Sequence, residues 1–115
     1  KIPEMIVRLR EIADKYQLKM VIFGHAGDGN LHPNILTDKR NSEAMERVEQ
    51  AVGELFNAAL SLGGTLSGEH GIGYMKAPFL KMELGEIGYQ TLKKVKEVFD
   101  PKGVLNPGKI FLSDS

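Results

Sequence analysis

The chain contains no cysteine, and its 15 basic and 15 acidic residues cancel to a formal net charge of zero. Without cysteine there are no disulfides and no thiolate chemistry, so any metal site must use nitrogen and oxygen ligands. The balanced charge provides no overall field that would favour nucleic acid or an anionic membrane surface. The apolar runs are too short to cross a bilayer, and the N-terminus shows no signal peptide. We therefore expect a cytoplasmic protein with no nucleic-acid partner.

The 115 residues have the composition of an ordinary globular protein, with 42% hydrophobic and 26% charged residues. This length fits one domain with a modest core, which is marginal for a complete enzyme. The chain begins with Lys1-Ile2-Pro3 rather than with Met, already inside a predicted helix. We therefore expect it to be a fragment of a longer protein.

Hydrophobic periodicity predicts several helices and one β-hairpin. The expected helices cover residues 3–16, 41–62, 76–82 and 85–99, and the expected strands cover residues 18–24 and 30–37, with a short third strand at 65–67. Gly27-Asp28-Gly29-Asn30 is a strong turn signal between the two longer strands. The expected fold class is α+β, a small antiparallel sheet with helices packed on one face.

All of the histidines lie in two glycine-rich segments. These segments read Gly24-His25-Ala26-Gly27-Asp28-Gly29-Asn30-Leu31-His32-Pro33-Asn34 and Ser67-Gly68-Glu69-His70-Gly71-Ile72-Gly73. Histidine is the side chain whose charge state and metal affinity are most easily tuned near neutral pH. Their concentration indicates that the two segments build one site.

The first segment predicts a metal clip on one face of the hairpin. If Asp28 and Gly29 are the central turn residues, His25 lies opposite His32, with Cβ atoms about 5 Å apart. Asn34 follows His32 by two residues and therefore shares its face. A longer loop would shift this register.

The second segment would supply the anionic ligand. Glu69 completes a two-histidine, one-carboxylate set, which leaves coordination positions open, as in catalytic metal sites. In a regular strand Glu69 and His70 would point to opposite faces. The flanking Gly68 and Gly71 allow the loop to bend so that both side chains face one cavity.

Other interpretations of these segments remain open. The glycines and Asp28 also suit an ordinary turn. Ser67, a histidine and Asp28 would suit a hydrolase, but no Gly-x-Ser-x-Gly elbow is present. The pattern Gly68-x-x-Gly71-x-Gly73 departs from the usual dinucleotide-binding order. A metal hydrolase and a non-catalytic metal-binding or assembly module that self-associates are two such interpretations.

Three segments in order, residues 24–32, 67–73 and 99–109, resemble the C-terminal part of FAD-linked oxidases of the vanillyl-alcohol oxidase type. The resemblance is to the group of glycolate oxidase, D-lactate dehydrogenases and D-2-hydroxyglutarate dehydrogenase. It implies that residues 1–115 are the C-terminal part of a ferredoxin-like substrate (cap) domain, with the FAD-binding domain absent from this chain. The implied reaction is oxidation of a small D-2-hydroxy acid to the 2-oxo acid by the parent protein, and the fragment alone is expected to be inactive.

The resemblance also implies a role for each site residue. His25, His32 and Glu69 would bind a divalent metal, namely zinc, manganese or iron. Asn34 would contact the substrate. His70 would lie near the flavin and act as the catalytic base.

Further implications concern the C-terminal segment and the partners. Asn106 would be a contact on the flavin side, although a turn after a helix stop explains it equally well. The implied cofactor is FAD, bound mainly by the missing domain. The partners would be an iron–sulfur or other electron-acceptor subunit, which would place the protein at the periphery of the inner membrane, and a homo-oligomer is also open.

Overall fold

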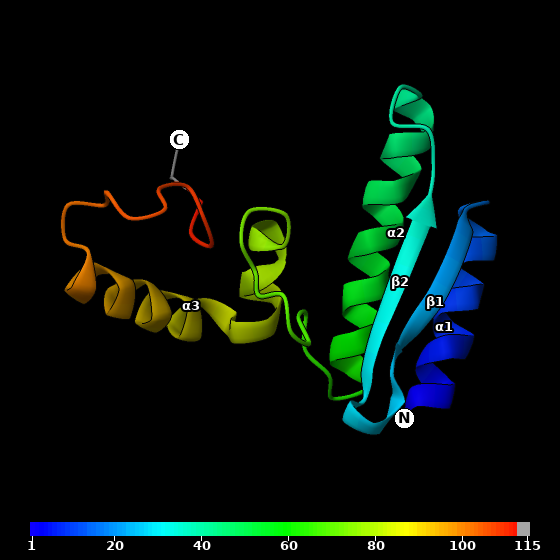
Figure 1. Ribbon diagram of the computed structural model, residues 1–115, viewed down its shortest axis with the longest axis horizontal. Helices are drawn as coiled ribbons and strands as arrows, with labels where there is room; N and C mark the ends of the chain where they lie inside the picture. Colours follow the sequence, from blue (N-terminus) through cyan, green and yellow to red (C-terminus); the bar gives the residue numbers. More distant parts are fainter. Residues whose placement is uncertain (113–115) are drawn as a thin grey trace. The chain divides into compact units, whose positions relative to one another are not determined.

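The computed structural model of the protein describes residues 1–112 (Figure 1). The chain divides into two compact units, Lys1–Gly68 and Glu69–Ser115, which are described separately. The described helices and the two-stranded antiparallel sheet confirm the predicted α+β class. None of the helices within residues 1–112 has the length and apolar character needed to span a membrane.

The first unit is a β-hairpin covered by two helices (Figure 1). Its elements are α1 (Ile2–Lys15), β1 (Lys19–His25), the 3₁₀ turn η1 (Ala26–Asp28), β2 (Asn30–Leu36) and α2 (Ser42–Ser61). Pro3 lies in the first turn of α1, where no intrahelical N–H donor is lost. The side chain of Asn41 caps α2 by accepting a hydrogen bond of 3.2 Å from the amide of Ala44.

The core of the first unit lies where the two helices pack together. Ile12 of α1 and Ala51 and Ala58 of α2 are buried there. Partly buried side chains surround them, namely Met5, Tyr16, Leu18 and Leu55. The small alanines on α2 permit this close approach of the helices, and the packing leaves one face of each helix for solvent.

Alternation along the hairpin separates a helix-facing side from an open side. Met20 and Ile22 of β1 line one groove with residues of α1. The same side of β2 carries the partly buried Leu31, Pro33 and Ile35. The open side carries Val21, Phe23 and His25 of β1 with Asn30, His32, Asn34 and Leu36 of β2. The sheet therefore presents both hairpin histidines on the face opposite the one that lines the groove with α1.

The predicted strand at residues 65–67 is wrong. In the described chain only β1 and β2 form a sheet. After α2, Gly63 adopts a φ of 83°, and the amide of Gly64 donates to the carbonyl of Ala59 at 2.8 Å. The chain therefore leaves α2 through a glycine turn. Leu66 is buried, but residues 65–67 belong to no strand of the described chain.

The second unit contains η2 (Ala77–Phe79) and α3 (Leu80–Phe99). The helix predicted at residues 76–82 corresponds to η2 and the first residues of α3, and the helix predicted at 85–99 corresponds to the rest of α3. Gly85 separates them, because its φ of 70° and ψ of 175° are not helical. Glycine tolerates this backbone conformation, which side chains with a Cβ atom avoid.

Asp100 organises the turn that follows α3. Its buried carboxylate accepts hydrogen bonds of 3.0 Å from the amides of Val104 and Leu105 and pairs with the ammonium group of Lys96. The hydrogen bond from Lys96, followed by those from the two amides, lowers the pKa of Asp100, although burial opposes the shift. Asn106 follows in a left-handed conformation, with a φ of 46°.

Replacing Gly24 with alanine should destabilise the hairpin. The added Cβ would lie 2.1 Å from the backbone oxygen of Asn30, which cannot move without disturbing the ladder. Overpacking of this kind costs about 1–3 kcal/mol, and the contact here is severe enough for the upper part of that range. Urea unfolding followed by circular dichroism measures the loss. Gly27→Ala is the matched control, because nothing lies within 4 Å of its Cβ. Equal stability of the two variants would contradict the close approach of the strands at Gly24.

Candidate metal centre

The hairpin register differs from the one that the sequence predicts. Phe23 pairs with His32, and His25 pairs with Asn30, so the prediction that His25 lies opposite His32 is wrong. The connection is longer than the predicted turn, because η1 occupies Ala26–Asp28 and Gly29 follows with a φ of 68°. The register moves by two residues. Since the side-chain period of a strand is also two, both histidines remain on the same face.

The two imidazoles are diagonal neighbours on the open face. Their ring centroids lie 5.5 Å apart, with an interplanar angle of 82°. His25 is exposed at the end of β1, whereas His32 is half-buried and its Nε2 atom is inaccessible to solvent. Phe23, directly across from His32, stacks on its ring at a centroid distance of 5.1 Å and an angle of 12°. The hairpin therefore presents two nitrogen ligands from neighbouring strands.

The end of the first unit leads the chain to this hairpin. Gly68 lies against Asn30 so closely that a Cβ at position 68 would displace the side-chain amide of Asn30. Asn30 is itself the strand partner of His25. The next residue after Gly68 is Glu69, where the second unit begins. Glu69 therefore directly follows a residue that lies against the strand partner of His25.

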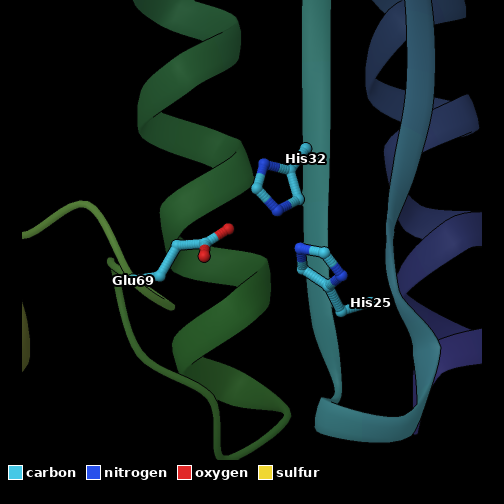
Figure 2. A group of neighbouring side chains, drawn as sticks. All are labelled: His25, His32 and Glu69. Atoms are coloured by element: carbon cyan, nitrogen blue, oxygen red, sulfur yellow. The ribbon is translucent and has the colours of Figure 1, made fainter.

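Figure 2 shows the Glu69 carboxylate directed toward the rings of His25 and His32. One ligand atom from each of these three residues lies within 4.8 Å of the other two. Two ligands bound to zinc at about 2.1 Å are at most about 4.2 Å apart. The upper limit of 4.8 Å is slightly longer than this spacing, and the Glu69 side chain is 45% exposed. The donor set of two imidazoles and one carboxylate fits a divalent metal with open coordination positions.

The remaining predicted site residues occupy separate positions. Asn34 pairs with Val21 on the open face, two residues beyond His32, as its sequence position predicts. His70 is exposed, and its Nε2 atom lies 4.0 Å from Oε1 of Glu69. Glu69 and His70 are both exposed, and that they face one cavity stays a prediction. Asn106 lies in the turn after α3, within the second unit.

Sequence reasoning missed two residues that shape this centre. Asn30, assigned to the turn, pairs with His25 and packs against Gly68. Phe23 stacks on His32. The signal for Phe23 is its position two residues before His25, which places it on the same face of the strand.

Comparison with known proteins relates this chain to one family of oxidoreductases. A sequence model of the family described as FAD linked oxidases, C-terminal domain, matches residues 1–110. The glycolate oxidase subunit GlcD of Bacillus subtilis is 52% identical over 115 residues, which are 100% of this chain and 24% of that protein. The D-lactate dehydrogenase of Archaeoglobus fulgidus is 39% identical over 110 residues, 96% of this chain and 24% of that protein. The mitochondrial D-lactate dehydrogenase [cytochrome] of Arabidopsis thaliana is 38% identical over 107 residues, 93% of this chain and 19% of that protein. The chain thus spans about a quarter of the length of these curated relatives.

Proposed function

Because this chain belongs to the family of FAD-linked oxidase C-terminal domains, we propose that it is the C-terminal part of the substrate domain of a flavin-dependent oxidoreductase. The proposed reaction is oxidation of a small D-2-hydroxy acid, such as glycolate or D-lactate, to the 2-oxo acid. The names of the relatives support this substrate class. The single observation that carries the proposal is that His25, His32 and Glu69 cluster in a chain of this family, with one ligand atom of each within 4.8 Å of the others.

The proposed role of the three converging residues is to hold a divalent metal, namely zinc, manganese or iron. Such an ion acts as a Lewis acid that stabilises negative charge developing on a bound oxygen. Imidazole nitrogen and carboxylate oxygen suit all of these metals, and the donor set alone does not select one of them. The open positions left by three protein ligands are where hydroxyl and carboxylate oxygens of a hydroxy acid would be accommodated.

The flavin supplies the acceptor for the hydride that leaves the α-carbon. In this proposal the side chains of the chain bind and orient the substrate and take its proton. Asn34, on the same face as His32, orients the hydroxy acid through its amide. His70 accepts the hydroxyl proton on a ring nitrogen, and its 4.0 Å separation from Glu69 places it beside the proposed metal-binding carboxylate. Asn106 is proposed as a contact on the flavin side.

A flavin reduced in the full-length enzyme would need a partner that accepts its electrons. One class of relative is named as a subunit, and another carries cytochrome in its name. We therefore propose an electron-acceptor protein, either a further subunit or a separate carrier, as the partner of the full-length enzyme. A location at the periphery of the inner membrane would follow from such a partner.

The proposal is tested by flavin reduction in the full-length protein. We expect a yellow protein whose flavin absorbance is bleached under anaerobic conditions by D-lactate or glycolate, while L-lactate serves as the stereochemical control. Metal analysis of the same sample should find a divalent ion. Turnover without flavin would favour the metal hydrolase. Metal binding in a protein that neither carries flavin nor turns over a hydroxy acid would favour the non-catalytic assembly module.

A further inference from the structure

An aromatic side chain lies against one of the two histidines of the candidate metal centre. Phe23 faces His32 directly across the two strands and stacks on its ring almost in parallel, with an interplanar angle of 12°. The ring of His25 lies on the diagonal, with its centroid 5.5 Å from that of His32 and its plane at 82° to it. Of these two ring neighbours of His32, His25 is a proposed metal ligand, whereas Phe23 has no atom that could bind a metal.

Phe23 is exposed to 53%, which makes burial of its own apolar area a poor explanation for its position. Val21 and Leu36 lie on the same open face with exposures of 50% and 57%, but neither presents a ring to a histidine. The contact that distinguishes Phe23 from these neighbours is the stacking on His32.

We propose that Phe23 is a positioning residue that holds the plane of the His32 imidazole, so that a ring nitrogen is directed at the point shared by His25 and Glu69. This inference rests on the proposed metal role of His32. An imidazole turns about two side-chain bonds, and its second torsion is broad. A flat ring packed in parallel against it removes much of this freedom before the metal arrives. Preorganisation of this kind increases affinity without adding a contact to the metal.

The expected effect is moderate and specific. An aromatic pair contributes an interaction that corresponds to about a three- to tenfold change in an equilibrium constant. Phe23→Leu should therefore weaken metal binding by about three- to tenfold, because leucine keeps apolar bulk but has no flat face. Phe23→Tyr keeps the ring and should restore the affinity. Leu36→Ala is the matched control, because it removes an equally exposed apolar side chain from the same face without touching a histidine ring.

The experiment uses the full-length protein after removal of metal by a chelator. Zn²⁺ affinity is measured by competition with a chromophoric chelator in wild type, Phe23→Leu, Phe23→Tyr, Leu36→Ala and His32→Ala. Co²⁺ is then added as a spectroscopic probe, since its visible absorption reports the ligand geometry. Phe23→Leu should change the Co²⁺ spectrum, whereas Leu36→Ala should not. Thermal unfolding of each variant separates a local effect from a loss of folded protein.

The outcomes distinguish this inference from the proposed function. If His32→Ala binds Zn²⁺ as tightly as wild type, the proposed metal site is wrong, and the role of Phe23 falls with it. If His32→Ala loses binding but Phe23→Leu retains wild-type affinity and the wild-type Co²⁺ spectrum, the site stands and the positioning role alone is overturned. Equal weakening in Phe23→Leu, Phe23→Tyr and Leu36→Ala would also overturn it, because the effect would then not depend on the ring.

Discussion

Replacement of His25 with alanine should remove the metal and the oxidation of hydroxy acids together from the full-length flavoenzyme. His25 provides one of the three protein ligands in the proposed centre. Even residues outside the coordination shell change metal affinity by about 10–100-fold when mutated, so loss of a ligand should exceed about 100-fold. Turnover should fall in parallel, because substrate oxygens would lose the cation that stabilises their charge. Metal content by mass spectrometry and flavin reduction by stopped flow measure the two losses on the same sample.

Asp28→Asn provides the control for this prediction. Asp28 belongs to the same loop and is also exposed, but it is not one of the three clustered ligand residues. It should leave both metal content and flavin reduction unchanged. A His25→Ala enzyme that holds no metal but reduces its flavin at the wild-type rate would show that the metal has no part in the reaction.

Local signals in the sequence were sufficient for most of the fold. The apolar period along residues 3–16 and 41–62 predicted α1 and α2 to within a residue at each end, because one side of each helix packs in the core. By residue type either Asn41 or Ser42 could cap the second of these helices, and the structure shows Asn41 in that role. The strand expected at 65–67 failed, because a short apolar stretch does not reveal whether a partner strand is present.

The hairpin shows what sequence can and cannot determine about a site. The residues Gly27-Asp28-Gly29 predicted a turn, but they did not predict how many residues the connection contains. In the structure η1 occupies residues that a two-residue turn would have placed in the paired strands. The resulting shift by two residues preserved the face of both histidines and changed their partners. The prediction of a shared face therefore withstood an error in the register, and a shift by one residue would have destroyed it.

The segment that leads to Glu69 makes a long-range contact that hydrophobic periodicity does not predict. Gly68, the residue before Glu69, lies against Asn30, and the two are far apart in the chain. The sequence predicted flexibility at Gly68 but not this neighbour. Long-range contacts of this kind depend on tertiary packing. The assignment of the three metal ligands therefore used the family resemblance in addition to the spacing of residues.

His70→Ala should slow flavin reduction by about 10²–10⁴-fold, the range for loss of a general base. Metal should remain bound, because the cluster of ligand atoms consists of His25, His32 and Glu69 without His70. The prediction follows from the exposed position of His70 beside Glu69, with 76% of its side chain accessible. Rapid mixing of the full-length variant with D-lactate measures the rate of flavin reduction, and mass spectrometry measures the metal.

The comparison of His70→Ala with His25→Ala separates the two proposed roles. A base and a ligand predict different pairs of results, since loss of the base affects the rate alone, whereas loss of a ligand affects the rate and the metal content. If His70→Ala also loses the metal, His70 acts as a ligand rather than as the base. If it reduces its flavin at the wild-type rate with metal bound, another group takes the proton, and the 4.0 Å approach of His70 to Glu69 has no catalytic meaning.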